Sequence, residues 1–236
     1  MINRPKSTIR NPQTQSLFKN MASGAYYVIQ DLEMGLKSNQ NPHPIDINAF
    51  NSHGEQLIDL AITHDNPKIV SLILSYGFDL NKINYPHNKR DYYPLDLAVW
   101  HRDERFIMDM SVVDCLLDAG ANPDNISNTE NGNTALHHAV LAGKNKTVAS
   151  LLVKNDKRTG ANPNLSNKAG NTPLHIAARK GNLGILEQLL NAGADLSIRN
   201  HNNETAFSLA IANDKQEIVN AILINSPSPP LYPRCL

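Results

Sequence analysis

Two adjacent histidines, His137 and His138, are the residues whose type most directly suggests metal binding. If both lie on a helix, their side chains point about 100° apart and do not readily share one ion. None of the 9 histidines has the H-x-x-x-H or cysteine–histidine spacing of a zinc site. Cys115 comes directly before Leu116 and Leu117 in an apolar helical pattern, where a small core thiol is expected rather than a nucleophile. The sequence therefore predicts neither a metal site nor thiol catalysis.

A second group of side chains with catalytic potential lies in the segment HRDERFIMDMS, residues 101–111. It offers His101, Asp103, Glu104 and Asp109. A catalytic site needs several polar groups fixed around a reaction centre, and no pocket is evident in this segment. The chain also has no Gly-rich phosphate loop, G-x-S-x-G turn or kinase signature. We therefore expect a protein without enzymatic activity or cofactor, and an enzyme with its site in this segment is the least favoured alternative.

The composition excludes several classes of partner. Lys+Arg and Asp+Glu both number 22, whereas a protein that holds nucleic acid or an anionic membrane normally carries a basic excess. The 2 cysteines are too few for a disulfide framework and indicate a reduced compartment. The N-terminal residues lack the apolar core of a secretory signal, and no apolar run is long enough for a membrane-spanning helix. We expect an intracellular, cytoplasmic protein that contacts neither membrane nor nucleic acid.

An internal repeat supplies the elements that must position any binding residues. Thr172 begins TPLHIA, Thr205 begins TAFSLA about 33 residues later, and Thr134 begins TALHHA slightly more than one such period earlier. Each threonine suits a helix N-cap, because its hydroxyl accepts a hydrogen bond from an otherwise unpaired backbone N–H. The run ILEQLL, residues 185–190, then places apolar side chains on one helical stripe, and Gly193 suits the helix end. The pattern predicts pairs of short helices that bury their apolar faces by stacking on neighbouring pairs.

Weaker copies of the pattern come earlier in the chain. YPLDLA, residues 93–98, and QLIDLA, residues 56–61, occupy the position of TPLHIA in two earlier repeats. Asp96 and Asp59 stand there in place of the histidine. Residues 22–48 suggest a degenerate first copy, which makes six repeats in all.

These motifs resemble the ankyrin-repeat family, whose signature is Thr-Pro-Leu-His-x-Ala at a period of about 33 residues. The resemblance implies an all-α solenoid of about six helix-turn-helix repeats with hairpin loops. It covers residues 16–225, between a flexible N-terminal tail at 1–15 and a Pro-rich C-terminal tail at 226–236. The approximate repeat boundaries are 16–50, 51–86, 87–128, 129–166, 167–199 and 200–225.

The resemblance also implies a protein–protein interaction module. Ankyrin repeats bind partners on the hairpin before the signature and at the end of the first helix of each pair. The only tryptophan, Trp100, falls in such a position near a tyrosine and an arginine, and these residue types dominate interface hot spots. We predict partner binding by Lys89, Arg90, Tyr92, Trp100, His101, Asn131, Asn133, Leu141, Lys168, Asn171, Arg179, Lys180, Arg199, His201 and Asn202. The basic residues among them suit an acidic partner. The alternative to partner binding for Trp100 is that its side chain packs beneath residues 101–111.

Two other roles are compatible with the same repeats. One is a regulatory or inhibitory subunit of an enzyme, which differs from an adapter only in having a single partner. The asparagine-rich, irregular repeats and short tails also resemble ankyrin-repeat effectors that intracellular bacteria inject into host cells. That resemblance implies a secreted effector that acts on a host protein inside the host cell. We interpret the asparagines themselves as a compositional habit and assign them no chemistry.

The C-terminal tail contains one short motif. Pro229, Pro230, Leu231 and Tyr232 match the Pro-Pro-x-Tyr ligands of WW domains, whose grooves accept polyproline segments. A contact with a WW domain is one interpretation of this motif, and a plain disordered end is the other.

Overall fold

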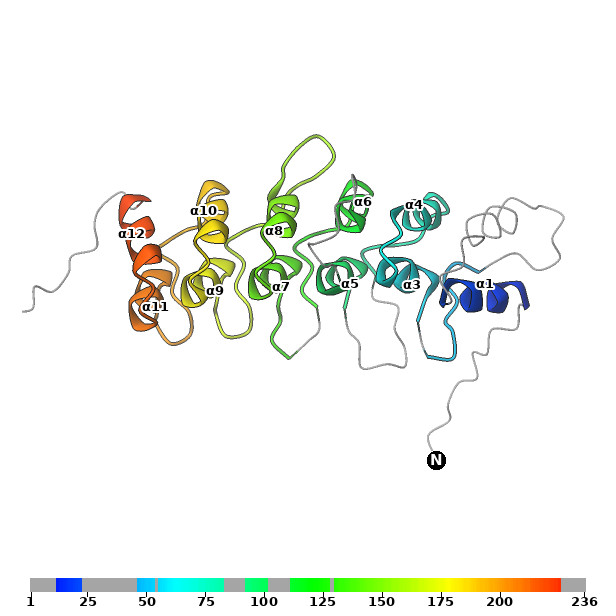
Figure 1. The fold of residues 1–236 in the computed structure, drawn as a ribbon, viewed down its shortest axis with the longest axis horizontal. Helices are drawn as coiled ribbons and strands as arrows, with labels where there is room; N and C mark the ends of the chain where they lie inside the picture. The colour runs from blue at the N-terminus through cyan, green and yellow to red at the C-terminus, as the bar shows by residue number, and fades with distance from the viewer. Residues whose placement is uncertain are drawn as a thin grey trace, which may run out of the picture. The chain divides into compact units, whose positions relative to one another are not determined.

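The computed structural model consists of helices, hairpin loops and turns. It describes residues 12–22, 46–53, 55–82, 92–101, 111–127 and 130–225. Within those ranges the only β-type pairing is an isolated antiparallel bridge between Phe50 and Gln56. In the described part of the chain, α1 precedes five pairs of short helices (Figure 1), so the predicted all-α repeat fold is confirmed. The chain divides into two compact units, residues 1–121 and 122–236, and each has its own packing.

The described residues of the first unit form one single helix and two helix pairs. Its helices are α1 (Pro12–Ala22), α3 (Leu57–Thr63), α4 (Pro67–Ser75), α5 (Pro94–His101) and α6 (Val112–Asp118). The first helix of each pair, here called the inner helix, packs on the inner helix of the next pair, so α3 contacts α5. The second, outer helices α4 and α6 also contact each other, and α1 packs on α3. The side chains of Leu57, Ile58 and Leu116 are fully buried in this unit.

The described residues of the second unit form three helix pairs in the same arrangement. Its helices are α7 (Ala135–Leu141), α8 (Asn145–Leu152), α9 (Pro173–Lys180), α10 (Leu183–Asn191), α11 (Ala206–Ala212) and α12 (Gln216–Asn225). The inner helix α9 packs against α7 and α11, and the outer helix α10 packs against α8 and α12. In this unit the hairpins extend from the inner-helix layer, on the side away from the outer helices (Figure 1).

The inner helices begin where the repeated threonines predict. In each case the backbone N–H of the threonine donates to the side chain three residues later, which satisfies a donor that the helix itself leaves unpaired. The pairs are Thr134 with His137 Nδ1 at 3.3 Å, Thr172 with His175 Nδ1 at 3.2 Å and Thr205 with Ser208 Oγ at 2.9 Å. These bonds start each inner helix at an equivalent position of its repeat.

The apolar stripe of α10 shows why the pairs stack. Ile185, Leu186 and Leu189 are fully buried, and Leu190 is half-buried. Helix α10 contacts α8, α9 and α12, so the stripe is covered by its own repeat and by both neighbours. Because burying one large aliphatic side chain contributes roughly 1.5–3 kcal/mol, stacking is a main source of stability in these short helices. Among the described residues, no helix has the length and apolar character needed to cross a membrane.

Candidate functional site

The signature histidines use both ring nitrogens inside the protein. Nδ1 of His137 accepts a hydrogen bond from the Thr134 backbone N–H and lies 2.8 Å from the Thr134 hydroxyl oxygen. Nε2 of His137 therefore carries the proton and donates to the Asn171 carbonyl, 2.9 Å away in the hairpin of the next repeat. His175 repeats the arrangement and donates to the Glu204 carbonyl at 3.0 Å. Each histidine thus ties the start of its own helix to the following hairpin.

Burial keeps these imidazoles neutral. Removal from water lowers the pKa of His137 to about 4, and the hydrogen bond to the Asn171 carbonyl offsets only part of this effect. Burial and then repulsion from His137 lower the pKa of His138 to about 4, and burial lowers the pKa of His175 as well. Over the described ranges of the chain, no group of three or more His, Cys, Asp or Glu side chains is arranged to hold a metal ion.

Aspartates occupy the histidine position in the first unit. Oδ2 of Asp59 accepts a hydrogen bond from the Gln56 backbone N–H at 2.8 Å, and Oδ2 of Asp96 accepts one from the Tyr93 N–H at 3.1 Å. Both carboxyls therefore act as helix caps. Burial raises the pKa of Asp96 to about 7, although the backbone N–H opposes that shift.

Asparagine side chains join consecutive hairpins in the second unit. Nδ2 of Asn167 donates to Oδ1 of Asn133 at 2.9 Å, and Nδ2 of Asn200 donates to Oδ1 of Asn171 at 2.9 Å. Asn133 is buried and Asn171 is half-buried. These two predicted partner-binding side chains therefore link neighbouring repeats.

The tips of the same hairpins are joined through the backbone. The Lys168 N–H donates to the Asn131 carbonyl at 3.0 Å, and the His201 N–H donates to the Ala169 carbonyl at 3.2 Å. The side chains of Asn131, Lys168 and His201 are nevertheless exposed. At Asn131, Lys168 and His201 the backbone therefore joins the hairpins, while the side chain stays exposed.

Asparagine also links the loops that follow the outer helices. Oδ1 of Asn164 accepts a hydrogen bond from the Asp195 N–H at 2.8 Å, while its Nδ2 donates to the Gly193 carbonyl at 3.0 Å. The interpretation of the asparagines as a compositional habit missed this role. The available signal was recurrence at the repeat period, since Asn167 and Asn200 occupy the same position in consecutive repeats.

Replacing Asn167 with alanine is expected to lower the free energy of unfolding of the second unit by roughly 1–3 kcal/mol. The reason is that Oδ1 of buried Asn133 would lose its donor, and an unsatisfied buried acceptor carries that cost. Urea unfolding followed by circular dichroism measures the loss. Asn202→Ala, at an exposed side chain of the next hairpin, is the control and should change stability by less than roughly 0.5 kcal/mol. Equal losses in both variants would contradict the inter-repeat role of Asn167.

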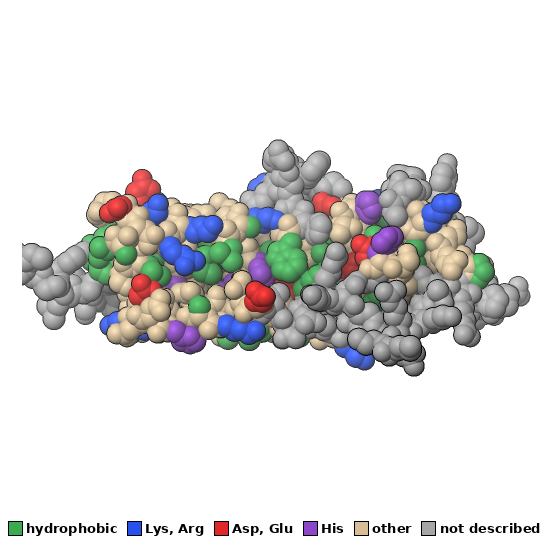
Figure 2. Space-filling model, turned by 90° about the horizontal axis from the view of Figure 1, so that it is seen from below, with side chains coloured by type: hydrophobic (Ala, Val, Ile, Leu, Met, Phe, Trp, Pro, Cys, Tyr) green, Lys and Arg blue, Asp and Glu red, His purple; other side chains and the backbone are tan. Residues whose placement is uncertain are grey.

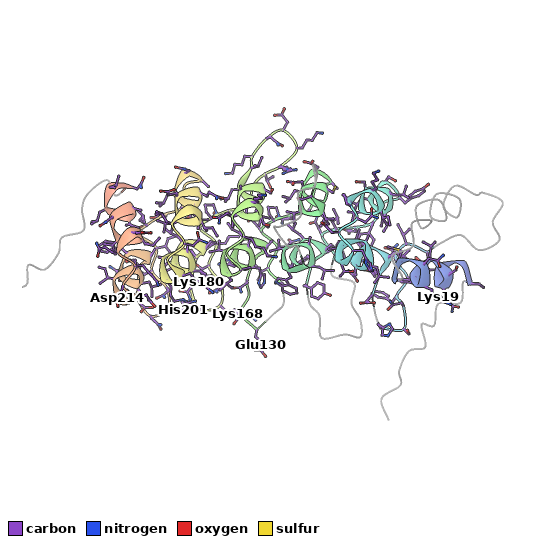
Figure 3. The ribbon with its side chains drawn as sticks, in the orientation of Figure 1. Lys19, Glu130, Lys168, Lys180, His201 and Asp214 are labelled. Carbon is purple, nitrogen blue, oxygen red and sulfur yellow. The ribbon has the colours of Figure 1, made fainter. Side chains whose placement is uncertain are left out.

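Exposed cationic side chains form the candidate surface of the second unit. Arg179 and Lys180 end α9, and both are exposed. Figure 2 views the second unit from its hairpin side and shows lysine and arginine side chains gathered over it. Figure 3 shows Glu130, Lys168 and His201 on the hairpins and Lys180 nearer the helices. Of the other predicted residues here, Arg199 and Asn202 are exposed and Leu141 is half-buried.

The first unit contains an aromatic pair that involves α5 and the residues just before it. The rings of Tyr92 and Trp100 meet edge to face, with centroids 5.2 Å apart and planes at 72°. Tyr92 is only 6% exposed, whereas Trp100 is 40% exposed. Trp100 is therefore anchored by a buried tyrosine and keeps part of its surface in solvent, which suits an interface aromatic.

Several predicted site residues are outside the part of the chain that the structure describes. They are Lys89, Arg90, the side chain of His101, and Pro229, Pro230 and Tyr232 of the tail motif. Most of residues 101–111 and most of the degenerate first repeat are outside it as well.

Comparison with known proteins identifies the repeats. The family model for ankyrin repeats (three copies) matches residues 97–200 and 157–230, which together make up more than half of the chain. The nuclear factor NF-kappa-B p105 subunit of Gallus gallus is 30% identical over 175 residues, which are 73% of this chain and 17% of that protein. The B-cell lymphoma 3 protein homolog of Mus musculus is 29% identical over 166 residues, which are 69% of this chain and 34% of that protein. The chain thus spans about a third or less of these relatives.

A solved structure resembles the chain over most of its length. It belongs to the complex of the Bd0816 predatory endopeptidase from Bdellovibrio bacteriovorus with the immunity protein Bd3460. One chain of that complex is 27% identical, with a TM-score of 0.66, and the match covers 88% of this chain and 96% of the other. The repeated caps, the stacked helix pairs and the match to the family model show that this chain belongs to the ankyrin-repeat family.

Proposed function

We propose that this chain binds a protein partner through side chains that its hairpins and inner-helix ends leave exposed. Its ankyrin repeats make it a protein–protein interaction module, and the proposal concerns which face and which residues do the binding. The main observation behind the proposal is that some predicted binding residues of the second unit are engaged within the fold and others are exposed. Asn133 and Asn171 are engaged between hairpins, whereas Arg179 and Lys180 are exposed at the end of α9.

The chemistry of this surface favours an acidic partner. Arg179 and Lys180 are adjacent cations, and Lys168 and Arg199 add positive charge on the hairpins before and after α9. Cationic side chains at the rim of an interface speed association with an acidic partner and make binding depend on salt. In the first unit, partly exposed Trp100 is a candidate aromatic anchor, and Tyr92 supports its position.

Reversing the charge of Arg179 tests this surface. The partner is first identified by capture on the immobilised wild-type chain and on an Arg179→Glu/Lys180→Glu variant. The relevant partner is one that the wild type captures and the double variant does not. Arg179→Glu should weaken the affinity for this partner by roughly 1–3 kcal/mol in low salt, and by less in high salt. Calorimetric titration at two salt concentrations measures both effects.

The matched control is Lys146→Glu, which makes the same charge change at an exposed position of the outer helix α8. It should leave the affinity for the partner almost unchanged. If Lys146→Glu weakens binding as much as Arg179→Glu, the partner does not contact the hairpin side specifically. The proposed surface would then be wrong.

A regulatory or inhibitory subunit of an enzyme is the second candidate function. The observation that favours it is the structural likeness to a chain from a complex of an endopeptidase with an immunity protein. Titration of Bd0816 endopeptidase activity with the purified chain separates an inhibitor from an adapter. Stoichiometric loss of activity supports inhibition, and full activity in molar excess removes this enzyme as the target.

Catalysis by the chain itself has no comparable support, because both ring nitrogens of His137 and His175 are hydrogen-bonded within the fold.

An effector role inside a host cell is supported only by the irregularity of the repeats. The inter-repeat bonds of Asn164, Asn167 and Asn200 give the asparagines a structural function, so asparagine content no longer favours an effector. A translocation reporter fused to the chain and expressed in an intracellular bacterium tests this role.

A WW-domain contact through the tail motif is a separate prediction. Titration of a WW domain with a peptide of residues 226–236 tests it.

A further inference from the structure

The loop that follows α8 differs from the loop that follows α10 in the next repeat. In repeat five the end of α10 closes with a hydrogen bond from the Ala194 N–H to the Leu189 carbonyl at 2.9 Å. In repeat four the equivalent bond, from Ala161 to Leu151 at 2.7 Å, is kept although five more residues lie between its partners. Gly160 also keeps the positive φ of Gly193, at 68° and 86° respectively.

The extra residues are therefore looped out between two points that keep the ordinary repeat geometry. Residues 153–159, here called the α8 loop, extend from the outer-helix layer on the side away from the hairpins (Figure 1). Packing of the repeat does not require them. A loop that a repeat retains without a packing role is a candidate for function.

Hydrogen bonds hold the α8 loop in one conformation. The backbone N–H groups of Asn155 and Arg158 donate to each other's carbonyls, at 3.0 and 3.2 Å, and so close a two-residue turn. Oδ1 of Asn155 also accepts hydrogen bonds from the N–H groups of Lys157 at 2.9 Å and Arg158 at 3.0 Å. A loop that is already ordered loses little conformational entropy when it binds.

The α8 loop presents cations beside an apolar side chain. Lys154 and Lys157 are exposed, Arg158 is half-exposed, and Asp156 is the only acidic residue among them. The side chain of Lys154 packs close to Gly160 at the base of the loop, because a Cβ built on Gly160 would lie 2.6 Å from the Lys154 Cγ. Val153 is 42% exposed at the start of the loop.

We propose that the α8 loop is a second docking surface, which binds an acidic segment of a protein partner that carries an apolar side chain. The α8 loop has three cations, and one carboxylate offsets part of their charge, so the loop can neutralise only a few phosphates of a nucleic acid. Polybasic segments that bind membranes typically use 4–8 lysines and arginines. The formal net charge of the chain is zero, which also disfavours nucleic acid and membrane. The surface lies away from the hairpins, so it does not depend on the function proposed above.

Two variants of the full chain test the proposal. The first replaces Val153–Thr159 with Asn-Ala, the residues between Leu190 and Gly193 of repeat five, and so removes the α8 loop. The second reverses charge at Lys154→Glu, Lys157→Glu and Arg158→Glu, and leaves the turn-closing bonds in place. Both should unfold in urea at nearly the wild-type midpoint. A third variant, Arg179→Glu/Lys180→Glu, reports on the hairpin side.

The probe is a fluorescein-labelled peptide, Glu-Glu-Leu-Glu-Glu, with a glutamine-substituted peptide as control. Fluorescence anisotropy should show binding to the wild type and to the Arg179→Glu/Lys180→Glu variant. Affinity should fall at least tenfold in both α8-loop variants, and amide chemical shifts should change within residues 153–160. The proposal is overturned if the wild type does not bind the peptide at millimolar concentration, or if only Arg179→Glu/Lys180→Glu loses binding. It is also overturned if phosphatidylserine vesicles or duplex DNA bind the wild type more tightly than the peptide does.

Discussion

Replacing Gly170 with alanine is expected to lower the free energy of unfolding of the second unit by roughly 3 kcal/mol or more. Gly170 has a φ of +76°, a conformation that costs a residue with a Cβ roughly 1–2 kcal/mol. A Cβ at this position would also lie 2.6 Å from the His201 backbone nitrogen and 3.1 Å from the Asn200 carbonyl carbon. Because both are backbone atoms, the two hairpins must separate. The bond from His201 to Ala169 then weakens.

Gly193→Ala is the matched control for this prediction. Gly193 has a similar φ of +86°, but a Cβ there would meet no atom within 4 Å. It should therefore cost only the roughly 1–2 kcal/mol of the left-handed conformation. Urea unfolding of both variants gives the difference directly. If the two substitutions cost the same, the close approach of the hairpins contributes little to stability.

Lowering the pH from 7 to 5 is expected to weaken the second unit and strengthen the first. The folded pKa of His137 is about 4, below its usual 6.5, so between these values the unfolded state binds more protons. This contribution to stability is complete above pH 6.5 and is lost as the pH falls toward 4. The lowered pKa values of His138 and His175 act in the same direction.

Asp96 has the opposite effect. Its folded pKa of about 7 lies above the usual 3.8, so between these values the folded state binds more protons. The stability it contributes is complete below pH 3.8 and is lost as the pH rises through 7. At about 1.4 kcal/mol for each unit of pKa difference, His137 should cost the second unit roughly 2 kcal/mol between pH 7 and 5. Asp96 should stabilise the first unit by roughly the same amount over that range.

Each unit has its own probe for this experiment. The chain has 1 tryptophan, Trp100, on the same helix as Asp96, so its fluorescence in urea follows the first unit. Amide signals from α9, recorded by NMR over the same urea series, follow the second unit. Asp96→Asn should remove the response of the first unit. His137→Ser, which introduces the residue that repeat six has at this position, should reduce the response of the second. A shift of both units in the same direction would contradict these assignments.

The fold could be predicted from the sequence because its signals are local. A threonine followed three residues later by a side chain that accepts its N–H starts each of the inner helices α7, α9 and α11. The stripe of Ile185, Leu186 and Leu189 and the glycine that follows define the outer helix within one short window. Each element depends on residues within about ten positions of itself, so a single sequence with a repeat period is enough to recognise it.

The roles of the candidate binding residues depended on contacts between repeats. Asn133 and Lys168 are both polar hairpin residues, and the sequence predicts the same partner-binding role for each. The tertiary structure buries Asn133 under Asn167 of the next hairpin and leaves Lys168 exposed. A contact across about 34 residues leaves no local pattern that distinguishes a buried amide from an exposed one.

Recognition of the chain as an all-α stack of ankyrin repeats needs only its amino-acid sequence, because helix caps, apolar stripes and terminating glycines act over a few residues. Two features came only from the three-dimensional contacts: Asn164, Asn167 and Asn200 join neighbouring repeats, and the extra residues after α8 form a closed turn outside the helix layers. These contacts cannot be read from the sequence because an amide side chain bonds whichever group folding brings within about 3 Å. For Asn164, Asn167 and Asn200 that group belongs to a neighbouring repeat.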